Sequence, residues 1–245
     1  MKTLQQSPKL REVFQKKISA KKSTKRQEIN QVLGNSLLGQ LGSFVYEFKQ
    51  VKNQLKGSSG EWFVSTILKS FPDTWIMFNN ALIPTDDLGG LTEIDHLIIG
   101  SKGIFLLEIK TWKGSFTAYQ DKWKRREGKN WVSLSDSPTS QSAYHQKMFS
   151  RWIVSLFPNL PDNCIYAPVV FPIAQWLGIN KCSVPVFQGV PALLQMMVSC
   201  SDCLTPAQVQ LIAEAVSNYK IPENTNPIPK IIPKPKLVKR QNHSS

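Results

Sequence analysis

Three charged residues lie in a stretch of the sequence that is otherwise strongly apolar. Residues 92–112 read TEIDHLIIGSKGIFLLEIKTW, with Asp95 in the first apolar run and Glu108 and Lys110 in the second. Charged side chains are rarely placed in strands this apolar unless another group satisfies them. Two carboxylates with a lysine beside them therefore indicate a site where acids hold a cation and an amine acts next to it.

The turn Gly-Ser-Lys-Gly at residues 100–103 predicts that the two apolar runs form an antiparallel hairpin. A two-residue loop and a four-residue loop give the same register, in which Asp95 faces Glu108. Opposed side chains have Cβ atoms roughly 4.5–5.5 Å apart, so two carboxylates there destabilise the hairpin unless a proton or cation lies between them. Oxygen ligands from two carboxylates suit Mg²⁺, which keeps several waters besides. A three-residue loop would instead place the acids on opposite faces.

Two further charged residues extend this set. Lys110 shares a strand face with Glu108, about 6–7 Å away along the strand. A cation there would favour deprotonation of a metal-bound water or stabilise the anionic transition state of phosphoryl transfer. Glu61 lies in the first turn of a helix that the sequence predicts from residue 61. It either complements the helix dipole or reaches the metal.

The order and spacing of these residues resemble the nuclease-related domain family, NERD, over about residues 57–157. That family is assigned to the PD-(D/E)xK nuclease superfamily. The resemblance implies an α/β, restriction-endonuclease-like core, a mixed sheet with an antiparallel catalytic hairpin flanked by helices. The motifs that carry it are Gly60-Glu61, Glu93-Ile94-Asp95-His96, Gly103-Ile104-Phe105, Glu108-Ile109-Lys110-Thr111-Trp112-Lys113-Gly114, and Ser137-Pro138 with Gln141.

The resemblance also implies roles for individual residues and a reaction. Asp95, Glu108 and the carbonyl of Ile109 would bind Mg²⁺ or Mn²⁺, and Lys110 would position or activate the attacking water. Glu61 matches the family's helix glutamate, which can extend the metal site. Gln141 matches the glutamine of the second core helix, which orients a neighbour or contacts phosphate. The implied function is metal-dependent hydrolysis of phosphodiester bonds in nucleic acid, DNA before RNA.

The positive charge of the chain is concentrated at its two ends. The formal net charge is +13, carried by residues 1–60 and 220–245, whereas residues 61–219 are close to neutral. We therefore expect a basic helical N-terminal arm at 1–55, a nuclease-like domain at 57–219, and a basic, Pro-rich disordered tail at 220–245. Basic ends suit nucleic acid first and an anionic membrane surface second, and the alternative is that both are solvated tails.

Other features bear on location and partners. No run approaches the roughly 18 apolar residues of a spanning helix, and the first residues lack a secretory pattern, which favours a cytoplasmic protein. Val32 to Phe48 has apolar residues at helical spacing, which suits packing on the body or lying on a membrane surface. Of four cysteines, Cys164, Cys182, Cys200 and Cys203, only the last two have short zinc-ligand spacing, and we expect reduced thiols.

Further elements follow from hydrophobic periodicity and turn residues. We expect strands at 75–78, 164–171 and 184–187, a strand pair within 112–132 ending in a basic loop at 122–129, and helices at 137–157 and 206–219 with Thr205 as N-cap. His96 is expected to pack or lie at the surface, and His145 to lie on a helix surface. Trp112 and Trp123 are expected to pack rather than to stack on bases.

Two other functions remain open at this level. The same fold could be a non-catalytic module that binds DNA or a partner protein. It could also be a membrane-associated adaptor that uses Val32 to Phe48. An enzyme of this kind could in addition need a partner protein or act as a homodimer.

Overall fold

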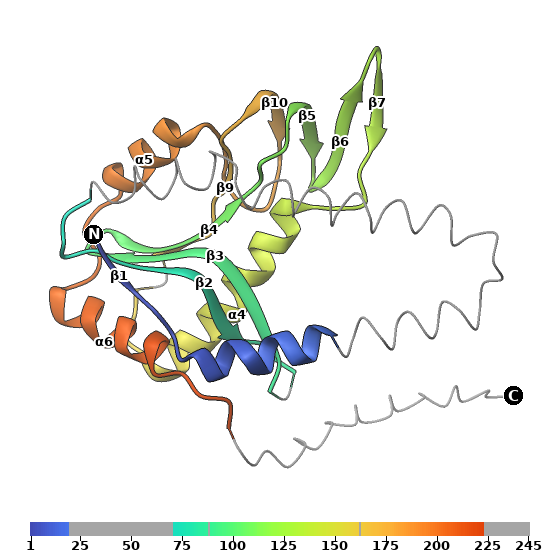
Figure 1. Cartoon of the computed structure of the whole chain (residues 1–245). Helices are drawn as coiled ribbons and strands as arrows, with labels where there is room; N and C mark the ends of the chain where they lie inside the picture. Colours follow the sequence, from blue (N-terminus) through green and yellow to red (C-terminus); the bar gives the residue numbers. More distant parts are fainter. Residues whose placement is uncertain (20–70, 88, 162, 223–245) are drawn as a thin grey trace, which may run out of the picture.

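The computed structural model describes residues 1–19, 71–87, 89–161 and 163–222, which form two β-sheets with helices on both faces of the larger one (Figure 1). Three regions named above lie outside the described residues: Glu61, the segment from Val32 to Phe48, and the tail from residue 223 onward. None of the helices in the described ranges combines the length and the apolar character that a membrane crossing requires.

The larger sheet is mixed, which confirms the predicted α/β class. Its strand order is β1-β2-β3-β4-β9-β11, and β8 also pairs with β4. The pairs β2–β3 and β3–β4 are antiparallel, whereas β1–β2, β4–β8, β4–β9 and β9–β11 are parallel. The strands are β1 (Lys2–Leu4), β2 (Ile76–Pro84), β3 (Leu91–Gly100), β4 (Gly103–Ile109), β8 (Ile165–Tyr166), β9 (Val169–Phe171) and β11 (Val186–Gln188).

The strand expected at 164–171 is divided into β8 and β9. Ala167 and Pro168 separate the two pieces. Proline has no backbone N–H to donate to a neighbouring strand, which interrupts the ladder at this point. The carbonyl of Pro168 still accepts from the N–H of Glu108 at 3.2 Å, so β4 stays bound across the interruption.

The hairpin of β3 and β4 has the predicted register. Ile99 pairs with Ile104 and Leu97 with Leu106, about a turn at Ser101 and Lys102. Gly100 is required there because a Cβ on it would lie 2.3 Å from the ring of Trp75, which covers it. Trp75 in turn stacks on Phe105 of β4, with ring centroids 5.9 Å apart.

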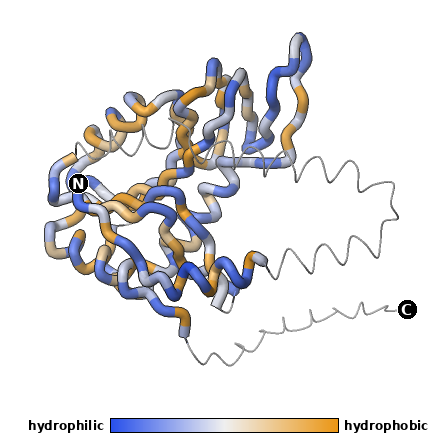
Figure 2. Tube along the Cα trace, in the orientation of Figure 1, coloured by the Kyte–Doolittle hydropathy of each residue, from blue (hydrophilic) through white to orange (hydrophobic). Residues whose placement is uncertain are grey.

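Side chains alternate along the strands and divide the core between the two faces of the sheet. On one face, Ile76, Leu97, Ile104 and Leu106 pack with α4 (Pro138–Leu156) and α6 (Pro206–Ser217). On the other face, Met77, Ile98, Phe105 and Leu107 pack with α5 (Val190–Ser199). Figure 1 shows α5 on one side of the sheet and α4 and α6 on the other, and the central strands are largely orange in Figure 2.

The helix ends follow the capping residues in the sequence. Ser137 caps α4, and Thr205 forms a capping box with Gln208 at the start of α6, as predicted. Helix α5 was not predicted, although Pro191 in its first turn and the apolar residues Val190, Leu193 and Met197 at helical spacing are a usable signal.

The smaller sheet corrects two expectations for residues 112–132. It holds β5 (Gly114–Tyr119), β6 (Lys122–Glu127), β7 (Asn130–Ser133) and, from later in the chain, β10 (Ala174–Asn180), in the order β10-β5-β6-β7. The expected strand pair is thus three strands, and most of the expected basic loop at 122–129 is strand β6. Its polar sequence hides the alternation, because Trp123 is its only buried side chain.

The first described residues belong to the folded body, although the sequence favoured an arm outside it. Strand β1 extends the larger sheet beside β2, and residues 8–19 form a helix in which Leu10 is buried. The side chain of Gln6 donates to the carbonyls of Leu82 and Val216 and accepts from the N–H of Leu82. This residue, two positions after β1, therefore joins the N-terminal segment to β2 and α6.

The tight contact at Gly100 gives a stability prediction. Gly100→Ala should lower the free energy of unfolding by about 1–3 kcal/mol, because its Cβ would overlap the Trp75 ring. Urea unfolding measures this value. In a Trp75→Ala background the overlap is removed, so the same substitution should have a smaller effect. An equal effect in both backgrounds would show that the ring contact is not the cause.

Candidate active site

Glu108 lies at the end of β4, and its carboxylate is almost completely buried, with 3% of the residue exposed. Its Oε1 is 2.7 Å from Nζ of Lys110, which follows on the same face. Its Oε2 accepts from Nε2 of Gln141 at 3.1 Å. Nζ of Lys110 also donates to Oε1 of Gln141 at 3.2 Å, so the three side chains form a closed set of contacts.

Asp95 adjoins this cluster at the point where β3 and β4 part. Their ladder ends at the pair His96 and Leu107, one step before Asp95 and Glu108. Oδ2 of Asp95 accepts from the backbone N–H of Ile109 at 2.7 Å, in the position where the ladder would otherwise continue. The structure thus brings together Asp95, Glu108, Ile109 and Lys110, the four residues that the sequence singled out on this hairpin.

Helix α4 presents the remaining polar groups to Glu108. Gln141 and His145 are four residues apart, so they lie on one face of the helix. Two hydrogen bonds fix the helix against the strands beside β4: the hydroxyl of Ser142 donates to the carbonyl of Ala167, and Nε2 of Gln146 donates to that of Ile165. Gln141, expected from the sequence, is therefore held at the carboxylate by a rigid element.

His145 corrects an expectation, because it is buried rather than on the helix surface. Its Nδ1 is 3.7 Å from Oε2 of Glu108, and its Nε2 is 3.0 Å from the hydroxyl of Thr92 on β3. Burial, and then the charge of Lys110, lower the pKa of His145 to about 4. It is a neutral ring at neutral pH. A polar residue four positions after Gln141 was the available signal for its place on the same helix face.

With Glu108 ionised, the cluster would hold two carboxylates and one ammonium group, so its negative charge would exceed its positive charge. Burial, and secondly the charge of Asp95, raise the pKa of Glu108 to about 7, although Lys110 acts in the opposite direction. In the absence of a further cation, Glu108 therefore keeps its proton well above the pH at which an ordinary glutamate releases it. A bound cation would favour the charged form.

The donors at this point fit a small hard cation. Two carboxylates, Asp95 and Glu108, and the implied carbonyl of Ile109 are oxygen ligands, the kind that Mg²⁺ prefers, with waters completing its shell. The described residues contain no group of three His, Cys, Asp or Glu side chains placed to hold a metal ion. A third carboxylate ligand would thus come from outside those residues, where Glu61 lies.

The other candidates from the sequence have structural roles. His96 is buried, and its Nδ1 lies 2.7 Å from Oδ1 of Asn79, consistent with a packed histidine; burial lowers its pKa to about 4. Trp123 is buried, with its indole N–H donating to the hydroxyl of Thr139. Trp112 packs against Trp123 and Phe171, edge to face. Packing, as expected, accounts for both tryptophans.

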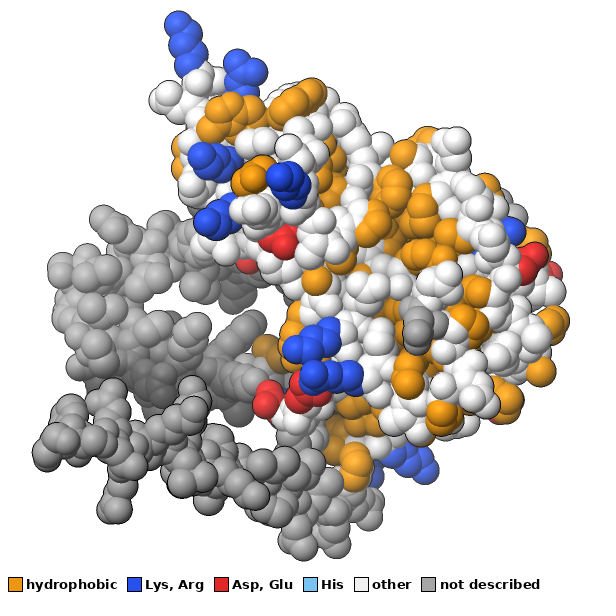
Figure 3. All heavy atoms as spheres, turned by 180° about the vertical axis from the view of Figure 1, so that it is seen from behind, with side chains coloured by type: hydrophobic (Ala, Val, Ile, Leu, Met, Phe, Trp, Pro, Cys, Tyr) orange, Lys and Arg blue, Asp and Glu red, His pale blue; other side chains and the backbone are white. Residues whose placement is uncertain are grey.

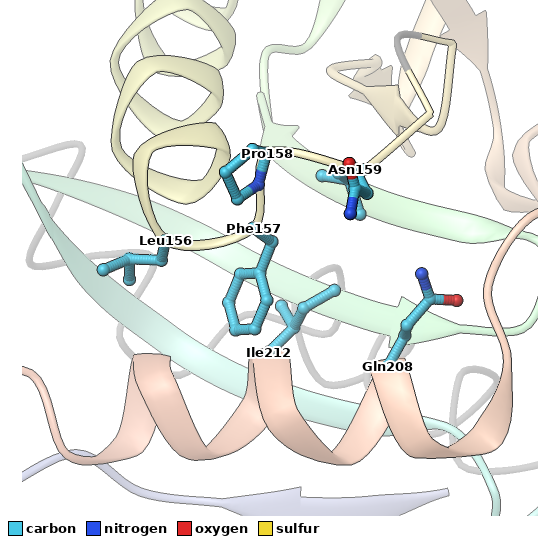
Figure 4. A pocket seen from close by; sticks show the side chains of 7 residues that line it. Leu156, Phe157, Pro158, Asn159, Gln208 and Ile212 are labelled. Carbon is cyan, nitrogen blue, oxygen red and sulfur yellow. The ribbon is translucent and has the colours of Figure 1, made fainter.

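A small pocket lies at the other end of α4, where that helix meets α6 (Figure 4). Its volume is about 220 Å³, below the usual range for ligand sites. None of the residues that line it has an ionisable side chain, so it offers no chemistry comparable to that at Glu108. They are Leu156, Phe157, Pro158, Asn159, Leu160, Gln208 and Ile212.

The raised pKa of Glu108 gives a prediction about stability and pH. Folded Glu108 binds its proton up to about pH 7, whereas the unfolded group releases it near 4.5, so this group's contribution to stability falls as pH rises between these values. In metal-free buffer, the stability of Glu108→Gln relative to wild type should rise by on the order of 3 kcal/mol across that window. Urea unfolding of both proteins at several pH values measures the difference, in which groups that do not contact Glu108 cancel. A difference independent of pH would contradict the raised pKa.

Comparison with known proteins agrees with this geometry. Residues 56–172 match the model of the family described as nuclease-related domain, NERD. Comparison with curated proteins and with solved structures gives no match. The matched residues include β2 to β9 and α4, and hence every described residue of the cluster around Glu108. The chain therefore carries a nuclease-related domain over residues 56–172.

Proposed function

We propose that the protein is a metal-dependent nuclease that hydrolyses phosphodiester bonds in nucleic acid, with DNA as its main substrate. The observation that carries the proposal is the contact of 2.7 Å between Lys110 Nζ and the buried Glu108, beside Asp95. Two carboxylates that favour a cation, with an amine next to them, are the groups that phosphodiester hydrolysis needs at one point.

The metal would be held by Asp95, Glu108 and the carbonyl of Ile109. Mg²⁺ or Mn²⁺ bound there supplies Lewis acidity and neutralises charge on the phosphodiester. Asp95 is oriented for this role by the N–H of Ile109, which fixes one of its oxygens. Glu108 is oriented by Gln141 on one oxygen and by Lys110 on the other.

Lys110 contributes the positive charge that the chain itself brings to the reaction. Its ammonium group lies between Glu108 and Gln141, which limit the positions that its long side chain can take. A fixed ammonium group next to the cleaved bond stabilises the charge that develops on phosphate oxygens and can orient the attacking water. His145, neutral at pH 7, adds no charge of its own and fills the space between Glu108 and Thr92.

Substitution of the hairpin residues tests the proposal. Asp95→Ala, Glu108→Ala and Lys110→Ala should each lower the rate of cleavage at least about 100-fold and leave DNA binding intact, because each removes charge only at the reacting group. End-labelled single-stranded, duplex and branched DNA with Mg²⁺ or Mn²⁺, and with EDTA, provides the measurement.

Asp86→Ala and Lys147→Ala are matched controls, since both residues are exposed and lie outside the cluster. These two variants should cleave as wild type does. Cleavage at the wild-type rate by all three hairpin variants, or cleavage that persists in EDTA, would rule out the proposed mechanism.

Gln141 provides a separate prediction, because it contacts Glu108 without being a metal ligand. Gln141→Ala should weaken Mg²⁺ binding or lower cleavage about 10- to 100-fold, as is typical for residues that orient a metal ligand. Titration calorimetry with Mg²⁺ measures the binding without substrate. Lys147→Ala, at an exposed position of the same helix away from Glu108, is the control. Identical affinities in the two variants would assign Gln141 no orienting role.

A further inference from the structure

The smaller sheet has two chemically different faces. Residues paired across a sheet point to the same side, and successive residues alternate. On the inner side, Phe116, Ala118 and Trp123 are buried in the core of the molecule, and Leu177 and Ile179 pack against that core. The pairs Tyr119–Lys122, Thr117–Lys124 and Arg126–Trp131, with Trp176–Ser115 from β10, define the opposite side, here called the outer face.

The outer face is basic. Lys122, Lys124 and Arg126 of β6 all lie on it, and all three are exposed. The complete set of strand residues on this face, all of them within the described part of the chain, contains no Asp or Glu. Glu127 points to the inner side, where it is paired with Arg125. The hydrophilic stretch of β6 is blue in Figure 2, and blue side chains gather over the β6–β7 hairpin at the upper left of Figure 3.

The outer face also carries exposed aromatic rings. Trp176, Ser115, Arg126 and Trp131 lie in one row across the four strands. Trp131 and Trp176, at the two ends of this row, approach each other, with the centroids of their indole rings 5.9 Å apart. They remain 39% and 49% exposed.

Gly178 makes room for one of these rings on the outer face. A Cβ at this position would be 2.1 Å from the indole of Trp176, so only glycine leaves room for the ring. At the far corner of the same face, Tyr119 is 49% exposed, with Nζ of Lys181 5.9 Å from its ring centroid. The face therefore combines flat, accessible rings with amines and a guanidinium.

We propose that the outer face of the β10-β5-β6-β7 sheet binds a single-stranded segment of nucleic acid, with bases stacked on Trp131 and Trp176 and phosphates at Lys122, Lys124 and Arg126. The basic residues match a polyanion, and stacking on exposed rings is how proteins bind unpaired bases of any sequence. In a duplex the base faces are covered by neighbouring pairs, so a duplex would use the amines but leave the rings unused.

Only a short stretch of chain separates the outer face from the candidate active site at Glu108. Strand β5 begins directly after the candidate active site, and Ser115 follows Lys110 by five residues, so their Cα atoms are at most about 18 Å apart. This is the length of about five stacked nucleotides of one strand. The proposal rests on the proposed function only in that the bound strand would be the substrate of that site.

Binding measured without catalysis tests the proposal. Fluorescence anisotropy in EDTA follows a labelled oligothymidylate and its duplex with oligoadenylate, added to the full chain. Trp131→Ala and Trp176→Ala should each weaken binding of the single strand about 5-fold or more, while Trp131→Phe and Trp176→Phe should retain most of the affinity. Lys124→Ala should weaken binding and reduce its salt dependence. Leu211→Ala and Lys147→Ala, exposed residues of α6 and α4, should bind as wild type does.

The outcomes separate this proposal from the nuclease proposal. Wild-type affinity in both Trp→Ala variants would overturn it, and so would duplex binding that is equally tight and equally sensitive to the two rings. Anionic vesicles that bind through these tryptophans, with oligonucleotide binding unchanged, would assign the face to a membrane and also overturn it. Ring-dependent binding by a protein that cleaves nothing would support the inference and reject only the nuclease.

Discussion

A buried carboxylate is the constraint on which the rest of the structure depends. Glu108 is at the end of a strand whose other side chains are all apolar, and it has lost nearly all contact with water. A charge in such a place is several kcal/mol unfavourable unless partners surround it. Lys110 follows directly after this strand, but Gln141 and His145 come from α4, so the helix must lie over this end of β4. The burial of Glu108 therefore accounts both for the position of α4 and for the polar residues of the site.

The same strand connects three parts of the molecule. β4 is antiparallel to β3 on one side, is parallel to β8 and β9 on the other, and continues after a short link into β5 of the smaller sheet. Its register is fixed from both sides over most of its length, by the ladder to β3 and by the carbonyls of Cys164, Pro168 and Val170. Side chains on such a strand have little freedom to move. This rigidity suits side chains that must act on one bond. The short link from β4 to β5 also places the start of the smaller sheet close to these side chains.

The local sequence was sufficient to predict the hairpin of β3 and β4, but it was insufficient to predict the side chains and strands that pack around this hairpin. The symmetric turn at 100–103 determines the register, because neighbouring strands joined by a short loop have few alternatives, and the caps at Ser137 and Thr205 act within one helical turn. Three features depend instead on distant contacts. His145 is buried because β4 presents a carboxylate to it. β10 pairs with β5, some sixty residues earlier. The stretch 122–127 is a strand because both of its neighbours are strands, against the bias of its own polar residues.

The three hydrogen bonds of Gln6 have a consequence for the order in which the chain folds during its synthesis. Its amide joins Leu82 and, 210 positions later, Val216. At 5–20 residues per second, roughly 10–40 s of synthesis separates the first of these residues from the last. During that interval β1 lacks the helix that secures it, and the edge of β2 that it will cover presents free N–H and C=O groups. The junction closes only after α6 has left the exit tunnel. The edge of the larger sheet at β1 is therefore among the last parts of the fold to be completed.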